Sequence, residues 1–135
     1  MSRKIEDLTP EAQEKHGLFK SAMDEAGIPF MVTCTMRTQA EQDALYEQGR
    51  TKPGPVVTWT RHSRHTPRIG DNGKSRAFDI AILKDGKPCW DAKVSVDGDR
   101  VPDYQEAGEI GERVGLRWGG RWKPADLCHF ETMEV

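Results

Sequence analysis

The sequence predicts an α+β fold in which helices flank a small, mainly antiparallel sheet. Helix signals lead the chain, and strand and turn signals gather after them, which is the order typical of an α+β domain. The chain has 135 residues, of which 36% are hydrophobic and 31% charged, so it can bury one core but is too short for two. We therefore expect a single domain that covers residues 1–135.

The first helix and the first strand have clear local signals. Thr9 is a good N-cap, and Pro10 suits the first helical position, so a helix should begin here. Gly27 is expected to end it, because glycine readily adopts the left-handed conformation that follows a helix. Residues 30–36 are rich in β-branched side chains and predict a strand.

A second helix should follow directly. Thr38 and Glu41 form a capping box, and we expect the helix to end at Gly49. Arg37 then lies at a strand-to-helix junction, where a side chain can project into a cleft. Residues 50–76 show little periodicity and predict a long loop, a feature that is uncommon in compact domains unless the loop is functional.

The C-terminal half alternates in a way that predicts strands. Residues 77–83 place large apolar side chains on one face and small residues with Asp79 on the other. A hairpin turn is expected at 85–86, and residues 102–114 should form a third helix. The last strand should surround 129–131, so that Asp79 and this segment belong to one sheet.

Composition excludes several classes of function. The net charge of −2 gives no global basic field, so we expect no nucleic-acid partner. Cys34, Cys89 and Cys128 are an odd number at wide spacing, which does not predict a disulfide framework. We expect Cys34 and Cys128 to be buried thiols in strands. No apolar segment suggests a secretory signal or membrane insertion, so we expect a protein made in the cytoplasm.

Three residues together predict a metal site. His65 and His129 offer imidazole nitrogens, and Asp79 offers a carboxylate placed mid-strand, where an unpaired charge is unfavourable. Three protein ligands with one open position are typical of catalytic zinc. Asp126 precedes His129 by one tight turn and can take a proton from a water molecule. Each histidine alone is weak evidence. The oxygen-rich triplets at 71–73 and 97–99 are expected to form turns, since neither fits the calcium-loop pattern.

These motifs resemble those of the M15 metallopeptidases. That family includes D-alanyl-D-alanine carboxypeptidases and dipeptidases and the L-alanyl-D-glutamate peptidases of phage lysis enzymes. The motif residues, in chain order, are Ser63-x-His65, Gly73, Ala77-x-Asp79 and Asp126-x-x-His129-Phe130-Glu131. Segments 36–51 and 116–122 also resemble family segments, and the resemblance runs from about residue 28 to 132.

The resemblance implies a Hedgehog/D,D-peptidase-like fold and a zinc ion. It implies that His65, Asp79 and His129 are the zinc ligands, and that Asp126 is the general base. The ligand set agrees with this independently, because two imidazoles and one carboxylate form a hydrolytic zinc set. We expect zinc as the only cofactor and no separate wall-binding domain.

The remaining site residues are expected to contact substrate or ligands. Arg37 would pair with a substrate carboxylate or stabilise an oxyanion, Ser63 would bind the substrate backbone, and Glu131 would orient a ligand imidazole. The family motif S-x-H-x-x-G-x-A-x-D places the first histidine much closer to the aspartate than here. The enlarged segment 66–78 therefore leaves His62 as a competitor for the first ligand, and otherwise as a substrate contact.

The resemblance leads to one expected function and several alternatives. We expect a zinc-dependent peptidoglycan peptidase that cleaves the stem peptide as an L-alanyl-D-glutamate endopeptidase, acting as a phage or prophage endolysin. Such an enzyme would be a monomer that reaches the wall after release from the host cytoplasm. The alternatives are a D-alanyl-D-alanine carboxypeptidase or dipeptidase, a non-catalytic zinc-binding module, and a metal-dependent nuclease.

Overall fold

The sheet is antiparallel throughout and organises the molecule. The computed structural model describes residues 1–133, so the last two residues of the expected 1–135 domain lie outside this range. The strands run in the order β1 (Phe30–Cys34), β2 (Ala77–Lys84), β5 (His129–Thr132) and β4 (Leu116–Trp118), and β3 (Lys87–Cys89) pairs with the far end of β2. The predicted antiparallel sheet is confirmed.

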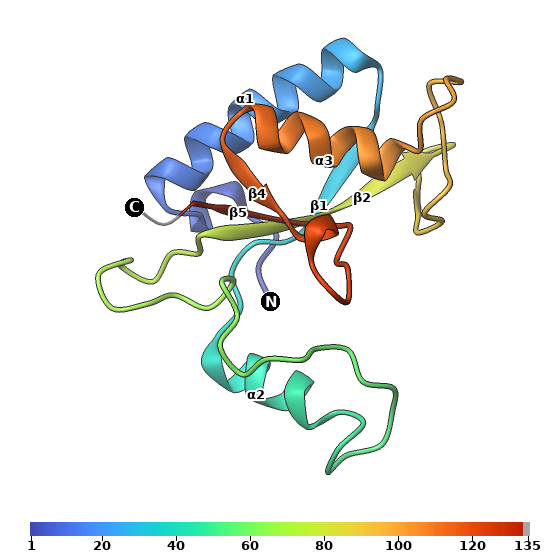
Figure 1. Ribbon diagram of the computed structural model, residues 1–135. Helices are drawn as coiled ribbons and strands as arrows, with labels where there is room; N and C mark the ends of the chain where they lie inside the picture. Colours follow the sequence, from blue (N-terminus) through green and yellow to red (C-terminus); the bar gives the residue numbers. More distant parts are fainter. Residues whose placement is uncertain (134–135) are drawn as a thin grey trace.

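The helices divide between the two sides of this sheet. Helices α1 (Pro10–Ala26) and α3 (Asp103–Arg113) cover one face, whereas α2 (Gln39–Glu47) lies on the other side beside the long loop (Figure 1). Short 3-10 turns at Ile5–Asp7 and Gly119–Arg121 precede α1 and follow β4. Among residues 1–133, no helix combines the length and apolar character needed to cross a bilayer. The three helices and the antiparallel sheet together confirm the α+β class predicted from the sequence.

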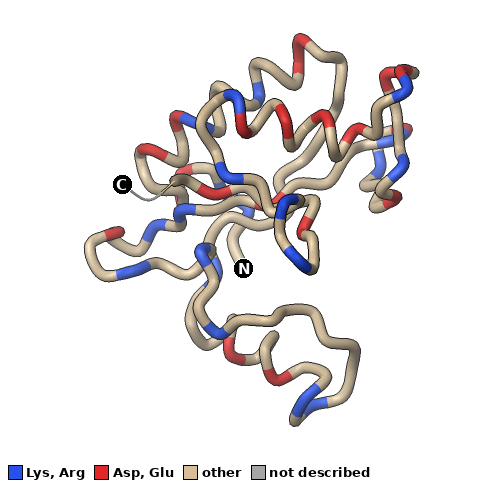
Figure 2. Tube along the Cα trace, in the orientation of Figure 1, with Lys and Arg blue, Asp and Glu red and all other residues tan. Residues whose placement is uncertain are grey.

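Charged residues of both signs are distributed along the whole chain. Figure 2 shows Lys and Arg interspersed with Asp and Glu on the helices and on the long loops alike. Several of these charges form local ion pairs, such as Lys20 with Asp24 within α1 and Arg121 with Glu112 beside α3. Such exposed pairs each stabilise a fold by about 1 kcal/mol or less, so the stability of the domain must come from its core.

The predicted helix starts follow the capping signals. Thr9 Oγ1 accepts a hydrogen bond from the Ala12 N–H at 3.2 Å, and Gly27 ends α1 with a φ of 73°. The Thr38 and Glu41 capping box is complete, because each side chain accepts the other residue's backbone N–H. These side chains satisfy amide groups that the first turn of a helix leaves unpaired.

A few details differ from the sequence expectation, among them strand β1, which ends at Cys34 rather than at residue 36. Helix α2 ends at Glu47 rather than Gly49, because the Glu47 carbonyl accepts the backbone N–H groups of residues 50–52 and reverses the chain. Cys128 is half-buried and lies just before β5 rather than within a strand, although its carbonyl still accepts the Ile80 N–H at 3.0 Å. None of these differences changes the placement of His65, Asp79 or His129.

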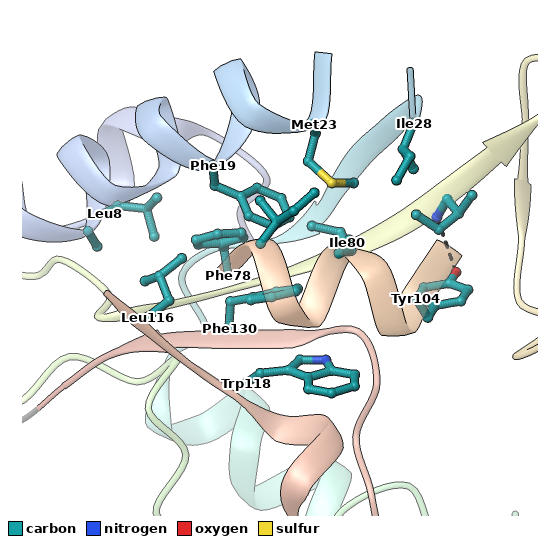
Figure 3. Packing of buried hydrophobic residues seen from close by; sticks show 14 of the residues in the cluster. Leu8, Phe19, Met23, Ile28, Phe78, Ile80, Tyr104, Leu116, Trp118 and Phe130 are labelled. Carbon is teal, nitrogen blue, oxygen red and sulfur yellow. Dashed lines mark hydrogen bonds between the residues drawn. The ribbon is translucent and has the colours of Figure 1, made fainter. Parts of the chain in front are cut away.

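The hydrophobic core fills the space between the sheet and the pair α1 and α3 (Figure 3). Phe78 on β2 stacks on Phe130 of β5 with ring centroids 5.5 Å apart, and Phe19 of α1 packs on Phe130 at 4.8 Å. Tyr104 is buried with its hydroxyl satisfied, since it donates to the Cys89 carbonyl and accepts the Ile82 N–H. Because successive strand residues face opposite sides, the residues next to Phe78 and Phe130 face away from this core.

Two glycines of α3 permit the close packing of this layer. A Cβ built on Gly108 would lie 2.2 Å from ring atoms of Trp118, and one on Gly111 would lie 2.5 Å from Phe130. Trp118 is 5% exposed, and its indole N–H donates to the Leu127 carbonyl at 2.9 Å. Helix α3 therefore packs directly on the Trp118 ring, and this ring holds the segment leading into β5 through its hydrogen bond to Leu127.

The variant Gly108→Ala should lower the free energy of unfolding by roughly 1–3 kcal/mol, because the new methyl group overlaps the Trp118 ring. Urea denaturation measures this change. Gly17→Ala is the matched control, since Gly17 lies in α1 with nothing within 4 Å of its Cβ position. The control should raise stability by about 0.5–1 kcal/mol. Equal stability of Gly108→Ala and the parent protein would contradict the described packing.

Candidate metal centre

Three side chains from three separate segments meet on the sheet face opposite the core. The Asp79 Oδ1 atom lies 3.0 Å from His65 Nε2 and 3.0 Å from His129 Nδ1. One donor atom from each of the three residues lies within 4.8 Å of the other two. The structure thus brings together all three residues that the sequence proposes as metal ligands.

Strand pairing and loop hydrogen bonds position these three residues. Asp79 and His129 are directly opposite each other in the β2–β5 register, so their side chains share one face. His65 comes from the long loop. Ser63 Oγ accepts the His65 N–H at 3.1 Å, and the His65 carbonyl accepts the Arg37 N–H at 2.9 Å. These bonds hold the loop against the end of β1.

The second nitrogen of each imidazole also has a partner. His65 Nδ1 lies 2.8 Å from the Thr35 carbonyl, and His129 Nε2 lies 2.8 Å from Glu131 Oε1. Because these oxygens only accept, both nitrogens must donate. The Glu131 carboxylate is 3% exposed and is held by Arg64 Nε at 2.9 Å. The expected orienting role of Glu131 agrees with this contact.

The donor set fits a divalent metal. With Nδ1 of His65 and Nε2 of His129 acting as donors, the neutral rings direct lone pairs at a carboxylate oxygen of Asp79. That arrangement is repulsive unless a cation lies among the three atoms. Two imidazoles and one carboxylate are a common set for zinc, and partners such as Thr35 and Glu131 fix the tautomers that ligation requires.

Protonation of the histidines is the metal-free alternative, and the surroundings favour it strongly. Burial disfavours the charged form of His65, but the Asp79 carboxylate outweighs burial and raises the pKa of His65 to about 10. For His129, burial likewise lowers the pKa, but hydrogen bonds to Asp79 and Glu131 raise it above its usual value. Burial alone would raise the pKa of Asp79, yet the two imidazoles hold it well below its usual range. The site therefore strongly favours a positive charge, either as protons on the two histidines or as a metal ion.

The three donors lie in an open pocket of about 820 Å³. Arg37, His62, Ser63 and Asp126 are all among its lining residues, and so are three tryptophans. The tryptophans were not assigned to the site from sequence; they are Trp59, Trp90 and Trp122. The pocket thus collects every residue that the sequence proposes for catalysis or substrate binding.

Asp126 lies on the loop that leads into β5. Its N–H donates to the Gly119 carbonyl at 2.8 Å, and its own carbonyl accepts the His129 N–H at 3.3 Å. A Cβ on Gly119 would lie 2.5 Å from the Asp126 carbonyl oxygen, so the tight turn needs glycine there. Partial burial and the negative charge of Asp79 raise the pKa of Asp126. A carboxylate with a raised pKa accepts a proton more readily than an ordinary aspartate does.

Arg37 and His62 have different surroundings. The Arg37 guanidinium donates to Gln42 Oε1 at 2.7 Å and to Cys34 Sγ at 3.8 Å, so buried Gln42 fixes its direction at the pocket wall. His62 is exposed in the same wall. Of the two competing histidines, His62 and His65, it is His65 that lies with Asp79 and His129. The sequence does not distinguish Gln42 from the other polar residues of α2, and only its burial in the structure shows that it holds Arg37.

The enlarged segment 66–78 does not displace His65. Its two ends meet where the Arg76 N–H donates to the Arg64 carbonyl at 3.3 Å. Within it, Arg76 pairs with buried Asp71 at 2.9 Å, and Ser75 exchanges backbone hydrogen bonds with the N-terminal segment. None of residues 66–78 is among the lining residues of the pocket. The extra length therefore loops away from the three donors.

Comparison with known proteins identifies the family of this chain. Residues 58–132 match the model of an M15 peptidase family described as D-alanyl-D-alanine carboxypeptidase. The chain is also 36% identical over 129 residues to the peptidoglycan L-alanyl-D-glutamate endopeptidase CwlK of Bacillus subtilis (strain 168), covering 94% of this chain and 74% of CwlK. The chain belongs to the M15 peptidase family. The suspected resemblance is confirmed.

A solved structure supports the fold of this M15 peptidase. The L-Ala D-Glu endopeptidase ChiX of Serratia marcescens superposes with a TM-score of 0.68 and 20% sequence identity, covering 96% of this chain and 83% of ChiX. M15 peptidases are metallopeptidases, so the chain is a hydrolase of a metal-using family. The range matched by the family model contains all three donors and Asp126.

The pKa shifts predict how the stability of the metal-free peptidase depends on pH. The pKa of His65 rises from an ordinary 6.5 to about 10 on folding, so its contribution is complete below about pH 6.5 and is lost as pH rises through about 10. The free energy of unfolding should fall over that interval by up to about 1.4 kcal/mol per pH unit. Urea denaturation at several pH values measures it.

The control for this measurement is His65→Ala, in which the slope should become smaller because one of the two histidines with a raised pKa is gone. Zinc should bind more tightly as pH rises over the same interval, since metal and proton compete for the same nitrogen. A pH-independent free energy of unfolding of the metal-free parent protein would contradict the described contact between His65 and Asp79.

Proposed function

We propose that this chain is a zinc-dependent peptidoglycan peptidase that cleaves the bond between L-alanine and D-glutamate in the stem peptide. The convergence of His65, Asp79 and His129 within the range that resembles CwlK carries this proposal. CwlK is itself described as a peptidoglycan L-alanyl-D-glutamate endopeptidase, and the likeness extends over nearly the whole of this chain.

Zinc held by these three donors would supply a Lewis acid beside the scissile carbonyl and the attacking water. Asp126 takes the proton from that water and returns it to the leaving amine of D-glutamate. Its raised pKa suits both steps, because the same group must accept and then release the proton. Thr35 and Glu131 keep the two imidazoles in the tautomers that leave His65 Nε2 and His129 Nδ1 available for the metal.

The pocket walls suggest how the substrate is held. Arg37 offers a guanidinium whose direction Gln42 fixes, and it binds a substrate carboxylate or the developing oxyanion. Ser63 and His62 line the wall on the loop side and contact the peptide backbone. Trp59 is 71% exposed and Trp90 is 60% exposed, so both offer apolar surface to a bound stem peptide. Exposed tryptophans at a pocket are typical of ligand contact.

We also propose a biological role as a phage or prophage endolysin that acts as a monomer on the cell wall after release from the host cytoplasm. The small size of the chain and an aspartate base, Asp126, shortly before His129-Phe130 fit the lysis-enzyme branch of the family and support this role. The alternative activity is that of a D-alanyl-D-alanine carboxypeptidase, which is favoured by the description of the matching family model.

Digestion of purified peptidoglycan distinguishes the two activities. The endopeptidase should create free L-alanine carboxyl ends and free D-glutamate amino ends, which mass spectrometry of the fragments detects. A zinc-selective chelator should abolish this release, and added zinc should restore it. Release of D-alanine in place of these fragments would favour the carboxypeptidase, and release that persists without metal would exclude a zinc mechanism.

Asp126→Asn tests the proposed base. The variant should bind zinc like the parent protein, because Asp126 is not one of the three donors, and kcat should fall by about 10²–10⁴-fold because the water loses its proton acceptor. Elemental analysis and digestion assays measure the two effects. His129→Ala is the contrasting variant and should lose bound zinc together with activity. Wall digestion by Asp126→Asn at the parent rate would show that another group is the base.

A further inference from the structure

A tryptophan in the wall of the metal-site pocket is held in place although most of its surface is exposed to water. Trp59 is 71% exposed, and Val57, two residues before it, is 54% exposed. Both residues line the pocket. They lie on the long segment that follows α2, on the side of the sheet opposite α1 and α3 (Figure 1). Apolar surface that gathers at the wall of a pocket is typical of a ligand contact.

Arginine side chains hold the Trp59 ring. The Arg50 guanidinium lies 5.8 Å from the centroid of the Trp59 ring and 3.9 Å from that of the Tyr46 ring. Its direction is fixed, because it donates hydrogen bonds to the Tyr46 carbonyl and, at 3.1 Å, to the Thr58 carbonyl. The Arg61 guanidinium lies 4.5 Å from the same Tyr46 ring. Such cation–π contacts orient a ring and leave its remaining surface available. We call Tyr46, Arg50, Trp59 and Arg61 the Trp59 platform.

Buried Gln42 on α2 ties the Trp59 platform to the wall that carries Arg37. Its Nε2 atom donates to the Thr60 carbonyl at 2.6 Å and to Thr58 Oγ1 at 3.2 Å. Its Oε1 atom accepts a hydrogen bond from Arg37 at 2.7 Å. The two threonines flank Trp59 in the chain. One side chain therefore fixes both the Arg37 guanidinium and the backbone on either side of Trp59.

The proposed cleavage brings a sugar ring to this pocket. In peptidoglycan the amino group of L-alanine is joined, through a lactyl ether, to an N-acetylated amino sugar of the glycan strand. L-Alanine and the lactyl group each span about 3.5 Å, so the sugar begins roughly 7 Å from the scissile bond. A ring so close to the bond must lie within the pocket or at its rim.

The sugar suits the Trp59 platform better than the peptide does. L-Alanine offers a single methyl group and the D-glutamate side chain two methylenes, which are too small to cover an indole ring. A pyranose has a flat face of C–H groups that stacks on an aromatic ring, and an edge of hydroxyl and acetamide groups that needs polar partners. Arg61 is suited to this edge. Its side chain is 58% exposed, and Glu47 accepts one of its five N–H groups at 3.2 Å.

We propose that the Trp59 platform binds the amino-sugar ring that carries the stem peptide, with Trp59 against the C–H face and Arg61 at the polar edge. The inference rests on the proposed cleavage between L-alanine and D-glutamate, because that bond brings the sugar to this pocket. The enzyme then prefers stems that are still attached to the glycan over free stem peptides. The segment that follows α2 sets this preference, and the metal centre does not.

Two synthetic substrates test the preference with the zinc-loaded enzyme. One is a peptide that begins with L-alanine and D-glutamate and carries the sugar through its lactyl group. The other is the same peptide capped with a lactyl group alone, so both have the same amide before the scissile bond. We expect kcat/KM to be about tenfold higher for the sugar-bearing substrate, which is the size of one ring stack. A ratio near one in the parent protein would overturn the proposal.

Variants of Trp59 locate the effect. Trp59→Ala should bring the ratio of the two kcat/KM values close to one, and Trp59→Phe should retain part of it because a ring remains. Trp90→Ala is the matched control, since Trp90 lines the same pocket and is 60% exposed. The control should keep the parental ratio, because any change in peptide binding affects both substrates alike. An equal fall of the ratio in Trp59→Ala and Trp90→Ala would contradict the specific role of Trp59.

Saturation-transfer NMR with a peptide-free tetrasaccharide of the glycan strand measures sugar binding without cleavage. The parent protein should transfer saturation to the ring protons of the sugar, and Trp59→Ala should lose this transfer. Transfer to the sugar without cleavage of either substrate would refute the proposed endopeptidase and support the sugar site. Cleavage of both substrates at equal rates without transfer would refute the sugar site and leave the endopeptidase intact.

Discussion

The register between β2 and β5 is the constraint on which the rest of the molecule depends. It pairs Phe78 with Phe130 on one face and Asp79 with His129 on the other. The first pair forms the centre of the core beneath α1 and α3, and the second forms two-thirds of the candidate metal centre. A slip by one residue would exchange the two faces, so that carboxylate and imidazole would enter the core. Folding and the site are therefore specified by the same hydrogen-bond ladder.

A continuous polar network extends from this register. It runs from Arg64 to Glu131, to His129, to Asp79 and to His65, and it ends at the Thr35 carbonyl. Most of its members are buried, so each depends on its neighbour for a partner that water would otherwise supply. Loss of one member leaves the next one buried and unpaired, which is more unfavourable than loss of an exposed hydrogen bond.

The sequence predicts the parts of this molecule that depend on local chemistry. Helix starts follow from Thr9 and from the Thr38 capping box, and the polar face of β2 follows from the alternation around Asp79. The Thr35 carbonyl could not be predicted, because every residue has such an acceptor and only the fold selects one. The same holds for the hydrogen bond from Arg37 to Gln42, since tertiary packing brings these two groups together.

The two ends of segment 66–78 lie close together, and this has a consequence for engineering. Because the Arg64 carbonyl and the Arg76 N–H already join its two ends, the path between them can change in length without stretching the segment that carries His65. Ile69 at the tip is fully exposed, and the neighbouring Gly70 is exposed as well. Exposed tips whose ends lie close together accept inserted modules well. A targeting peptide or an affinity module can therefore be inserted at this tip without changing the positions of the metal-site residues.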